Sequence, residues 1–180
     1  PIKNTRFLVF MLATVRAVHQ HGGLLRSAVA SAGNDHRLGA NEAPPAIMSV
    51  FLGEELTDII DRLEKSNLSE KERGGGVIDM GVNTLPHVAK DTTDRNRTSP
   101  FAFTGNKFEF RAVGASMNIS VANTVLNTIV AESLDEMAKR ITDERKAAKD
   151  LTAAIASVLR KTIAEVRPVI FNGDNYSAEW

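Results

Sequence analysis

The chain contains no cysteine among its 180 residues. Disulfide bonds, thiolate nucleophiles and zinc-thiolate sites are therefore excluded within it. The absence suits a reducing compartment such as the cytoplasm. An excess of charge of either sign is also missing, because 22 Lys and Arg balance 22 Asp and Glu. This balance argues against nucleic acid or an anionic membrane as a partner bound by bulk charge, whereas small charged substrates need only a local cluster.

Long hydrophobic runs are missing as well. The most apolar run, residues 7–13, is far shorter than the roughly 20 residues of a membrane span. The residues after 18 contain no small-residue cleavage pattern, so no signal peptide is expected. The chain begins at Pro1 without an initiator methionine and ends in a turn-rich stretch at Trp180, from which we expect a piece of a longer polypeptide; the alternative is a processed start and a mobile tail. Its length and 43% apolar content still allow one domain with a hydrophobic core.

The hydrophobic pattern predicts a mixed α+β chain. Helical spacing predicts helices over residues 4–21, 24–32, 54–65, 118–140 and 144–167, and short apolar or alternating runs predict strands over 47–52, 77–82 and 107–113. The pair Gly22-Gly23 is expected to end the first helix, and Pro168 the last. Residues 34–45, 66–76 and 83–106 are expected to be loops or linkers.

One predicted strand carries an unusual set of charges. Lys107, Glu109 and Arg111 alternate with Phe108 and Phe110, so the charged side chains share one face and the phenylalanines enter a core. A carboxylate between two cations suits a divalent metal beside phosphate, since it offers a hard oxygen ligand while the cations offset phosphoryl charge. The alternative is a solvated face with cross-strand ion pairs.

The loop over residues 33–45 concentrates polar and charged side chains. Arg37 is a planar bidentate donor suited to a substrate carboxylate, and Glu42 could take a proton or hold a cation. A surface salt bridge of Arg37 with a neighbouring acid is the alternative, and His36 is expected to be structural.

Two motifs in this order resemble the glutamine synthetase family. Residues 31–45, Ser-Ala-Gly-Asn-Asp-His-Arg-Leu-Gly-Ala-Asn-Glu-Ala-Pro-Pro, resemble its substrate loop. Residues 94–100, Asp-Arg-Asn-Arg-Thr-Ser-Pro, and 105–111, Gly-Asn-Lys-Phe-Glu-Phe-Arg, resemble its Asn-Arg-Ser-type and Arg-Ile-Glu-x-Arg-type motifs. The sequence of these segments, together with Asn-Thr-Arg-Phe-Leu-Val-Phe at 4–10, is most similar to the large type III members. The resemblance extends from about Asn4 to Trp180.

The resemblance implies roles for residues of the first two motifs. Arg37 would grip the carboxylate of glutamate, with Asn41 also in the substrate site. Glu42 would shield a γ-glutamyl phosphate and take a proton from ammonium. Arg97 would stabilise the phosphoryl group in transfer, with Arg95 beside it on the ATP phosphates.

The third motif carries two further implied roles and two departures from the family pattern. Glu109 would be a metal ligand and Arg111 a substrate-binding residue. Lys107 stands where the family usually has an arginine. Lysine keeps the positive charge for ATP binding but cannot donate two parallel hydrogen bonds as a guanidinium does. Ala102 stands where a further arginine is usual.

For the whole protein the resemblance implies ATP-dependent ligation of ammonium to glutamate with Mg²⁺ or Mn²⁺, in the cytoplasm, by a dodecamer of two hexameric rings. It implies that residues 1–117 form the second half of a catalytic barrel of antiparallel strands with packed helices, and that 118–180 begin a helical extension. The family's remaining metal ligands are expected before Pro1, so the chain alone should be inactive. Two alternatives stay open: a related glutamate–amine ligase, and a non-catalytic anion- or nucleotide-binding or assembly module.

Overall fold

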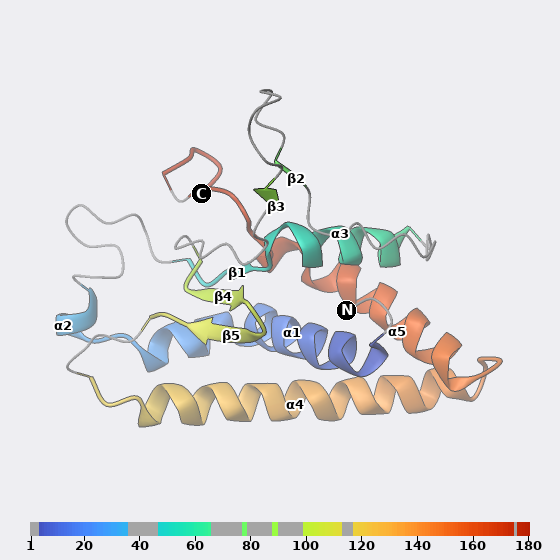
Figure 1. Ribbon diagram of the computed structural model, residues 1–180. Coiled ribbons are helices and arrows are strands. Elements are labelled where there is room, and N and C mark those ends of the chain that lie inside the picture. Colours follow the sequence, from blue (N-terminus) through green and yellow to red (C-terminus); the bar gives the residue numbers. More distant parts are fainter. Residues whose placement is uncertain are drawn as a thin grey trace.

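The computed structural model of the chain describes residues 4–35, 47–65, 77–78, 88–89, 99–112, 117–174 and 176–180. Within these residues the chain is α+β, mostly helical, with a small three-stranded sheet (Figure 1). No helix in the described ranges has both the length and the apolar content that crossing a bilayer requires. The predicted fold class is therefore confirmed in outline, whereas a catalytic barrel is not seen in the described residues and stays a prediction.

Helix α1 (Thr5–Ala28) begins after Asn4, whose side-chain oxygen accepts a hydrogen bond of 3.0 Å from the N–H of Phe7. The predicted break at Gly22-Gly23 is confirmed in part, because the backbone leaves helical geometry one residue earlier. The helix bends at His21, where φ is −116° and ψ is 22°, and continues to Ala28. Leu25 on the continued turn is completely buried, so packing offsets the poor helix propensity of the two glycines. The predicted second helix thus merges into α1, and a short α2 (Ala32–Asp35) follows.

The main sheet has the strand order β1 (Val50–Phe51), β4 (Phe101–Thr104) and β5 (Lys107–Phe110). Strands β1 and β4 are parallel, and β4 and β5 form an antiparallel hairpin in the register Phe101↔Phe110 and Thr104↔Lys107. The two-residue turn begins with Gly105, whose φ of +63° suits glycine.

Strand β4 lies in a segment that we predicted to be loop, so that prediction is wrong there. A usable signal was present: two four-residue runs rich in Phe and Thr, separated by Gly-Asn, are typical of a hairpin. A second antiparallel pair, β2 (Val77–Ile78) and β3 (Val88–Ala89), also places a strand in the predicted loop.

Three predicted helices are present with shifted ends. Helix α3 (Gly53–Glu64) matches its prediction closely, α4 (Ser120–Arg145) runs beyond residue 140, and α5 (Leu151–Val166) begins later than predicted, before the short 3₁₀ turn η1 (Arg167–Val169). The late start of α5 follows from Asp150, whose Oδ1 accepts a hydrogen bond of 2.8 Å from the N–H of Ala153 and caps the helix.

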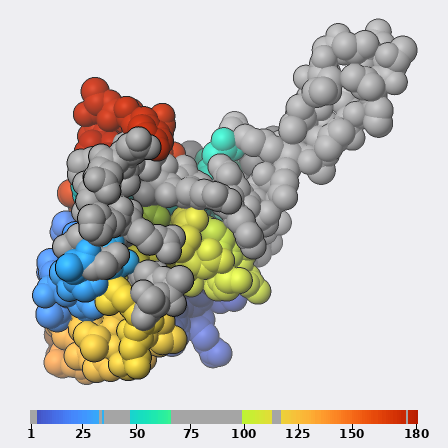
Figure 2. Space-filling view, turned by 90° about the vertical axis from the view of Figure 1, so that its left-hand side faces the viewer, coloured from blue at the N-terminus to red at the C-terminus, as the bar shows by residue number. Residues whose placement is uncertain are grey.

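Helices α1, α4 and α5 pack on one another, with α3 against α5 and the hairpin beside α1 (Figure 1). One buried cluster joins them all, and its largest fully buried members include Leu12, Ile60, Phe101, Met137, Leu159 and Ile163. Viewed from the side, the end of α1 lies against the start of α4 (Figure 2). This core draws on residues from both sides of position 117; the domain boundary proposed there stays a prediction.

Candidate functional site

The predicted site residues fall into two groups. Lys107, Glu109 and Arg111 lie on β5 or directly after it. The others, Arg37, Asn41, Glu42, Arg95 and Arg97, lie outside the described residues, as does His36. The geometry of the site is therefore built from β5 and the segments that hold it.

The charged face of β5 is as the alternation predicts. Lys107 Nζ lies 3.6 Å from Glu109 Oε1, so these two side chains share one side of the strand. The phenylalanines turn the other way: the Phe101 ring centroid lies 5.1 Å from that of Phe108 and 5.9 Å from that of Phe110. Burial of these rings against the core fixes which side of β5 carries the charges.

Arg111 is held at the end of the strand by the preceding segment. Its backbone N–H donates to the carbonyl of Pro100 at 2.7 Å, and its Nη2 donates to the carbonyl of Ser99 at 3.4 Å. Since Ser99 is two positions after Arg97 in the sequence, this contact brings Arg111 beside the end of the Asn-Arg-Ser-type motif. Arg111 as a whole is partly buried.

Ser99 is a residue that sequence reasoning missed. It is only 1% exposed. Its hydroxyl accepts a hydrogen bond of 2.9 Å from Ser49 Oγ and donates one of 3.2 Å to the carbonyl of Phe171. Three distant segments thus meet at one hydroxyl. Its place near the end of the 94–100 motif was the signal available in the sequence.

Asn34 is the second missed residue. It lies in α2, is 1% exposed, and its Nδ2 donates to the carbonyls of Val29 at 2.8 Å and Ala112 at 2.6 Å. Ala112 directly follows Arg111, so the amide joins the end of α1 to the end of the site strand. Within the sequence, only its position inside the substrate-loop motif singled it out.

A divalent metal does not find a full set of ligands in the described residues. Glu109 provides one half-buried carboxylate, and no group of three His, Asp or Glu side chains that could hold a metal occurs in the described ranges. Such ions take six or more oxygen ligands, or several waters with one or two carboxylates. Glu109 therefore fits as one ligand at most.

A second charged cluster lies between α1, α4 and α5. Glu165 Oε1 accepts hydrogen bonds of 3.2 Å from both Arg16 Nε and Gln20 Nε2, and Glu165 Oε2 accepts one of 2.7 Å from Arg140 Nη1. Arg16 is 3% exposed and also donates to Ser133 Oγ at 3.4 Å. These contacts hold three helices together, which indicates a structural role.

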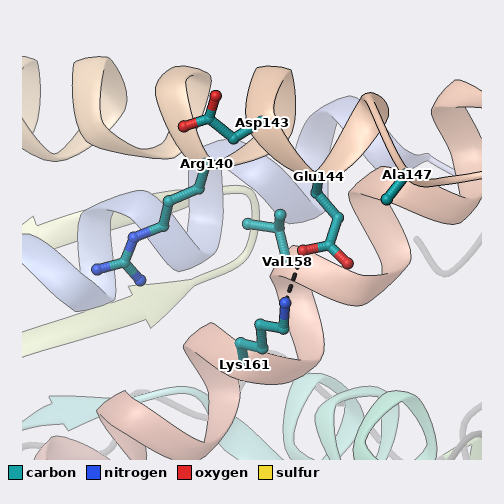
Figure 3. A pocket seen from close by; sticks show the side chains of 6 residues that line it. All are labelled: Arg140, Asp143, Glu144, Ala147, Val158 and Lys161. Carbon is teal, nitrogen blue, oxygen red and sulfur yellow. Dashed lines mark hydrogen bonds and ion pairs between the residues drawn. The ribbon is translucent and has the colours of Figure 1, made fainter.

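An open pocket lies next to this cluster, at the α4–α5 end (Figure 3). It is lined by Arg140, Asp143, Glu144, Ala147, Val158 and Lys161. Lys161 Nζ is paired with Glu144 Oε2 at 2.6 Å, and this contact and the hydrogen bond from Ser157 lower the pKa of Glu144. The charges across this pocket are thus paired within the chain, and Lys107, Glu109 and Arg111, the predicted site residues that the structure describes, do not line it.

Comparison with known proteins shows which sequences this chain resembles. The chain is 50% identical over 180 residues to the type-3 glutamine synthetase of Dictyostelium discoideum, covering all of this chain and 24% of that protein. It is 42% identical over 184 residues to a glutamine synthetase of Bacteroides fragilis and 40% identical over 182 residues to one of Butyrivibrio fibrisolvens, again over its full length and 25% of each relative.

The chain belongs to the glutamine synthetase family. The resemblance inferred from the motifs is confirmed, and the chain spans about a quarter of the length of these relatives. The glutamine synthetase C-terminal domain family matches residues 154–180, which comprise most of α5, η1 and the tail. The roles given to single residues of this glutamine synthetase segment stay predictions.

Proposed function

We propose that the full-length protein ligates ammonia to L-glutamate at the expense of ATP, giving L-glutamine through a γ-glutamyl phosphate. The observation that carries this proposal is the alignment of the whole chain, at 40% to 50% identity, with three proteins named glutamine synthetase. The contact of Arg111 with Ser99 supports it, because it joins the ends of two segments that resemble motifs of the family.

The substrate side of the reaction needs a carboxylate clamp and a base. Arg37 and Arg111, with Asn41, would bind glutamate through its charged groups. Ammonium is the common species near neutral pH but ammonia is the nucleophile, so a carboxylate must attract the cation and accept a proton. Glu42 would do both.

The phosphate side needs positive charge where the phosphoryl group transfers. The γ-carboxylate of glutamate is a poor electrophile, and phosphorylation by ATP gives it a good leaving group. Arg97 would offset the charge of the transferring group, with Arg95 and Lys107 on the ATP phosphates. Glu109 would contribute one oxygen ligand to Mg²⁺ or Mn²⁺, whose other ligands lie outside the described residues.

The family resemblance also bears on assembly and place of action. The full-length protein would act as a homo-oligomer, a dodecamer of two hexameric rings. A ligase that consumes ATP and glutamate works where both are abundant, so we place it in the cytoplasm.

The test is ADP release by the full-length protein in reactions that contain or omit glutamate and ammonium. We expect release only when both are present, with glutamine as the product. The 180-residue chain, assayed in parallel, should be inactive because it supplies only part of the site. Activity in this chain would mean that it holds a full set of metal ligands.

A panel of amines in the same assay separates the related ligases. Turnover with a larger amine in preference to ammonium would replace the proposal by a glutamate–amine ligase. ATP binding without turnover on any amine would favour the non-catalytic module.

A further inference from the structure

Both ends of the Arg111 segment are fixed by hydrogen bonds from elsewhere in the chain. On one side, the N–H of Arg111 donates to Pro100 and its Nη2 to Ser99. On the other side, the next carbonyl along the chain, that of Ala112, accepts a hydrogen bond of 2.6 Å from Asn34 Nδ2. Asn34 is thus the contact that holds the C-terminal side of Arg111.

The surroundings of Asn34 make this contact strong. Val29, Ala112 and Ala122 form a small buried cluster and are at most 3% exposed. With water excluded, an amide–carbonyl hydrogen bond gains strength and its loss leaves a buried carbonyl unpaired. The backbone of Asn34 is itself held, because its N–H donates to the carbonyl of Ser31 at 3.0 Å.

The chemistry of the side chain fits this task. The two N–H bonds of one amide nitrogen point to two carbonyl oxygens, those of Val29 and Ala112, which belong to segments far apart in the sequence. A carboxylate of the same shape would offer no donor and would set its charge against two carbonyl oxygens. Serine would offer one donor, and alanine none.

We propose that Asn34 is a positioning residue for glutamate binding, which acts by fixing Arg111 through the carbonyl of Ala112. This rests on the proposed function, in which Arg111 binds glutamate. Asn34 itself need not touch the substrate. Its loss should weaken the grip on glutamate and leave the ATP side of the site unchanged.

The test compares Asn34→Ala with wild type in the full-length protein, by steady-state kinetics for glutamate and for ATP. We expect the KM for glutamate to rise by about tenfold or more and the KM for ATP to change by less than about twofold, because only the glutamate clamp is displaced. Asn34→Ser, which keeps one donor, should give an intermediate KM and also serves if the alanine variant does not fold.

A matched control is available at Asn172. Its Oδ1 accepts hydrogen bonds from the N–H groups of Leu52 at 3.0 Å and Gly53 at 3.2 Å, so it too joins its own segment to a distant one, but that segment is the start of α3. Asn172→Ala should lower the thermal midpoint and leave the KM for glutamate unchanged. A parallel rise of that KM in both variants, or no rise in Asn34→Ala, would overturn the inference.

Amide hydrogen exchange of residues 110–112 separates this inference from the proposed function. Faster exchange there in Asn34→Ala, but not in Asn172→Ala, supports the positioning contact whether or not the protein turns over. Unchanged exchange overturns it. An inactive wild type with that same faster exchange would overturn only the proposed function.

Discussion

Glu165 joins three helices through one carboxylate. Arg16 and Gln20 reach it from α1 and Arg140 reaches it from α4. Burial alone would raise the pKa of Glu165, but the hydrogen bond and charge of Arg140, together with those of Arg16, outweigh it and hold that pKa below the usual 4.5. A carboxyl group whose pKa is lower in the folded protein stabilises the fold above its unfolded pKa.

Glu165→Gln should therefore weaken the contact of α5 with α1. The Arg16 side chain is 4% exposed, and it would lose the nearer of its two charged partners without gaining water, since Glu132 Oε2 lies 4.0 Å from its Nη1. We expect the free energy of local opening of α1 and α5, from amide hydrogen exchange, to fall by about 1–3 kcal/mol at pH 7. The difference from wild type should shrink as the pH falls through the lowered pKa that Glu165 has in the folded protein, because the wild-type carboxylate then becomes protonated.

Asp135→Asn is the control for this prediction. Asp135 pairs with Lys139 on the exposed side of α4, where solvent screens both groups. The opening free energies should match wild type. A Glu165→Gln effect of equal size at pH 7 and at a pH below the lowered pKa of Glu165 would show that shape and not charge is responsible.

At the residue scale, sequence reasoning found the side chains whose arrangement is local. The shared face of Lys107 and Glu109 follows from strand alternation alone, which acts over two residues. Asn34 and Ser99 could not be found in this way. Their partners, Ala112 and Phe171, lie 78 and 72 positions away, and only the folded chain brings them together.

At the scale of elements, two glycines with open space around them should respond in opposite ways to the same change. A Cβ at Gly105 or at Gly23 would meet nothing within 4 Å, so packing does not decide either case. Gly105 has a φ of +63°, which costs an L side chain about 1–2 kcal/mol. Gly23 lies inside α1, where alanine gains roughly 0.8–1 kcal/mol over glycine.

Gly105→Ala should therefore lower the opening free energy of the β4–β5 hairpin, and Gly23→Ala should raise that of α1. Amide hydrogen exchange of the two variants against wild type is the measurement. If both changes have the same sign, backbone conformation is not what distinguishes these positions.

The same physical distinction explains which elements the sequence could predict. Helices α3 and α5 carry apolar residues at helical spacing. These residues lie on one face of each helix, which is the face that packs on the core, so the pattern in the sequence was enough to predict the helix. The bend in α1 at His21 lies next to the break predicted at Gly22-Gly23, but the continuation of the helix to Ala28 could not be predicted, since the burial of Leu25 comes from tertiary packing. Strand β4 could have been predicted from its turn.

At the scale of the whole molecule, the C-terminal segment is part of the central packing. Leu159, Ile163 and Val166 of α5 lie in the same buried cluster as residues of α1, α3 and β1. Beyond α5, the N–H of Phe171 donates to the carbonyl of Val50 at 2.9 Å. The family match over residues 154–180 therefore falls on a segment that contacts the sheet carrying the candidate site.

This arrangement predicts that damage to α5 spreads to elements early in the chain. Leu159→Ala removes a side chain that is 1% exposed, and we expect a loss of about 2–5 kcal/mol in the opening free energy of α1 and α3 as well as α5. Leu151→Ala makes the same change on the same helix where the side chain is 54% exposed, and should cost under about 0.5 kcal/mol. Amide hydrogen exchange across the chain measures the opening free energies in both variants. In Leu159→Ala, protection could be lost only after residue 117. The helical region would then open by itself, as the predicted division at that position requires. A loss shared with α1 and α3 would instead mean that one core holds both parts.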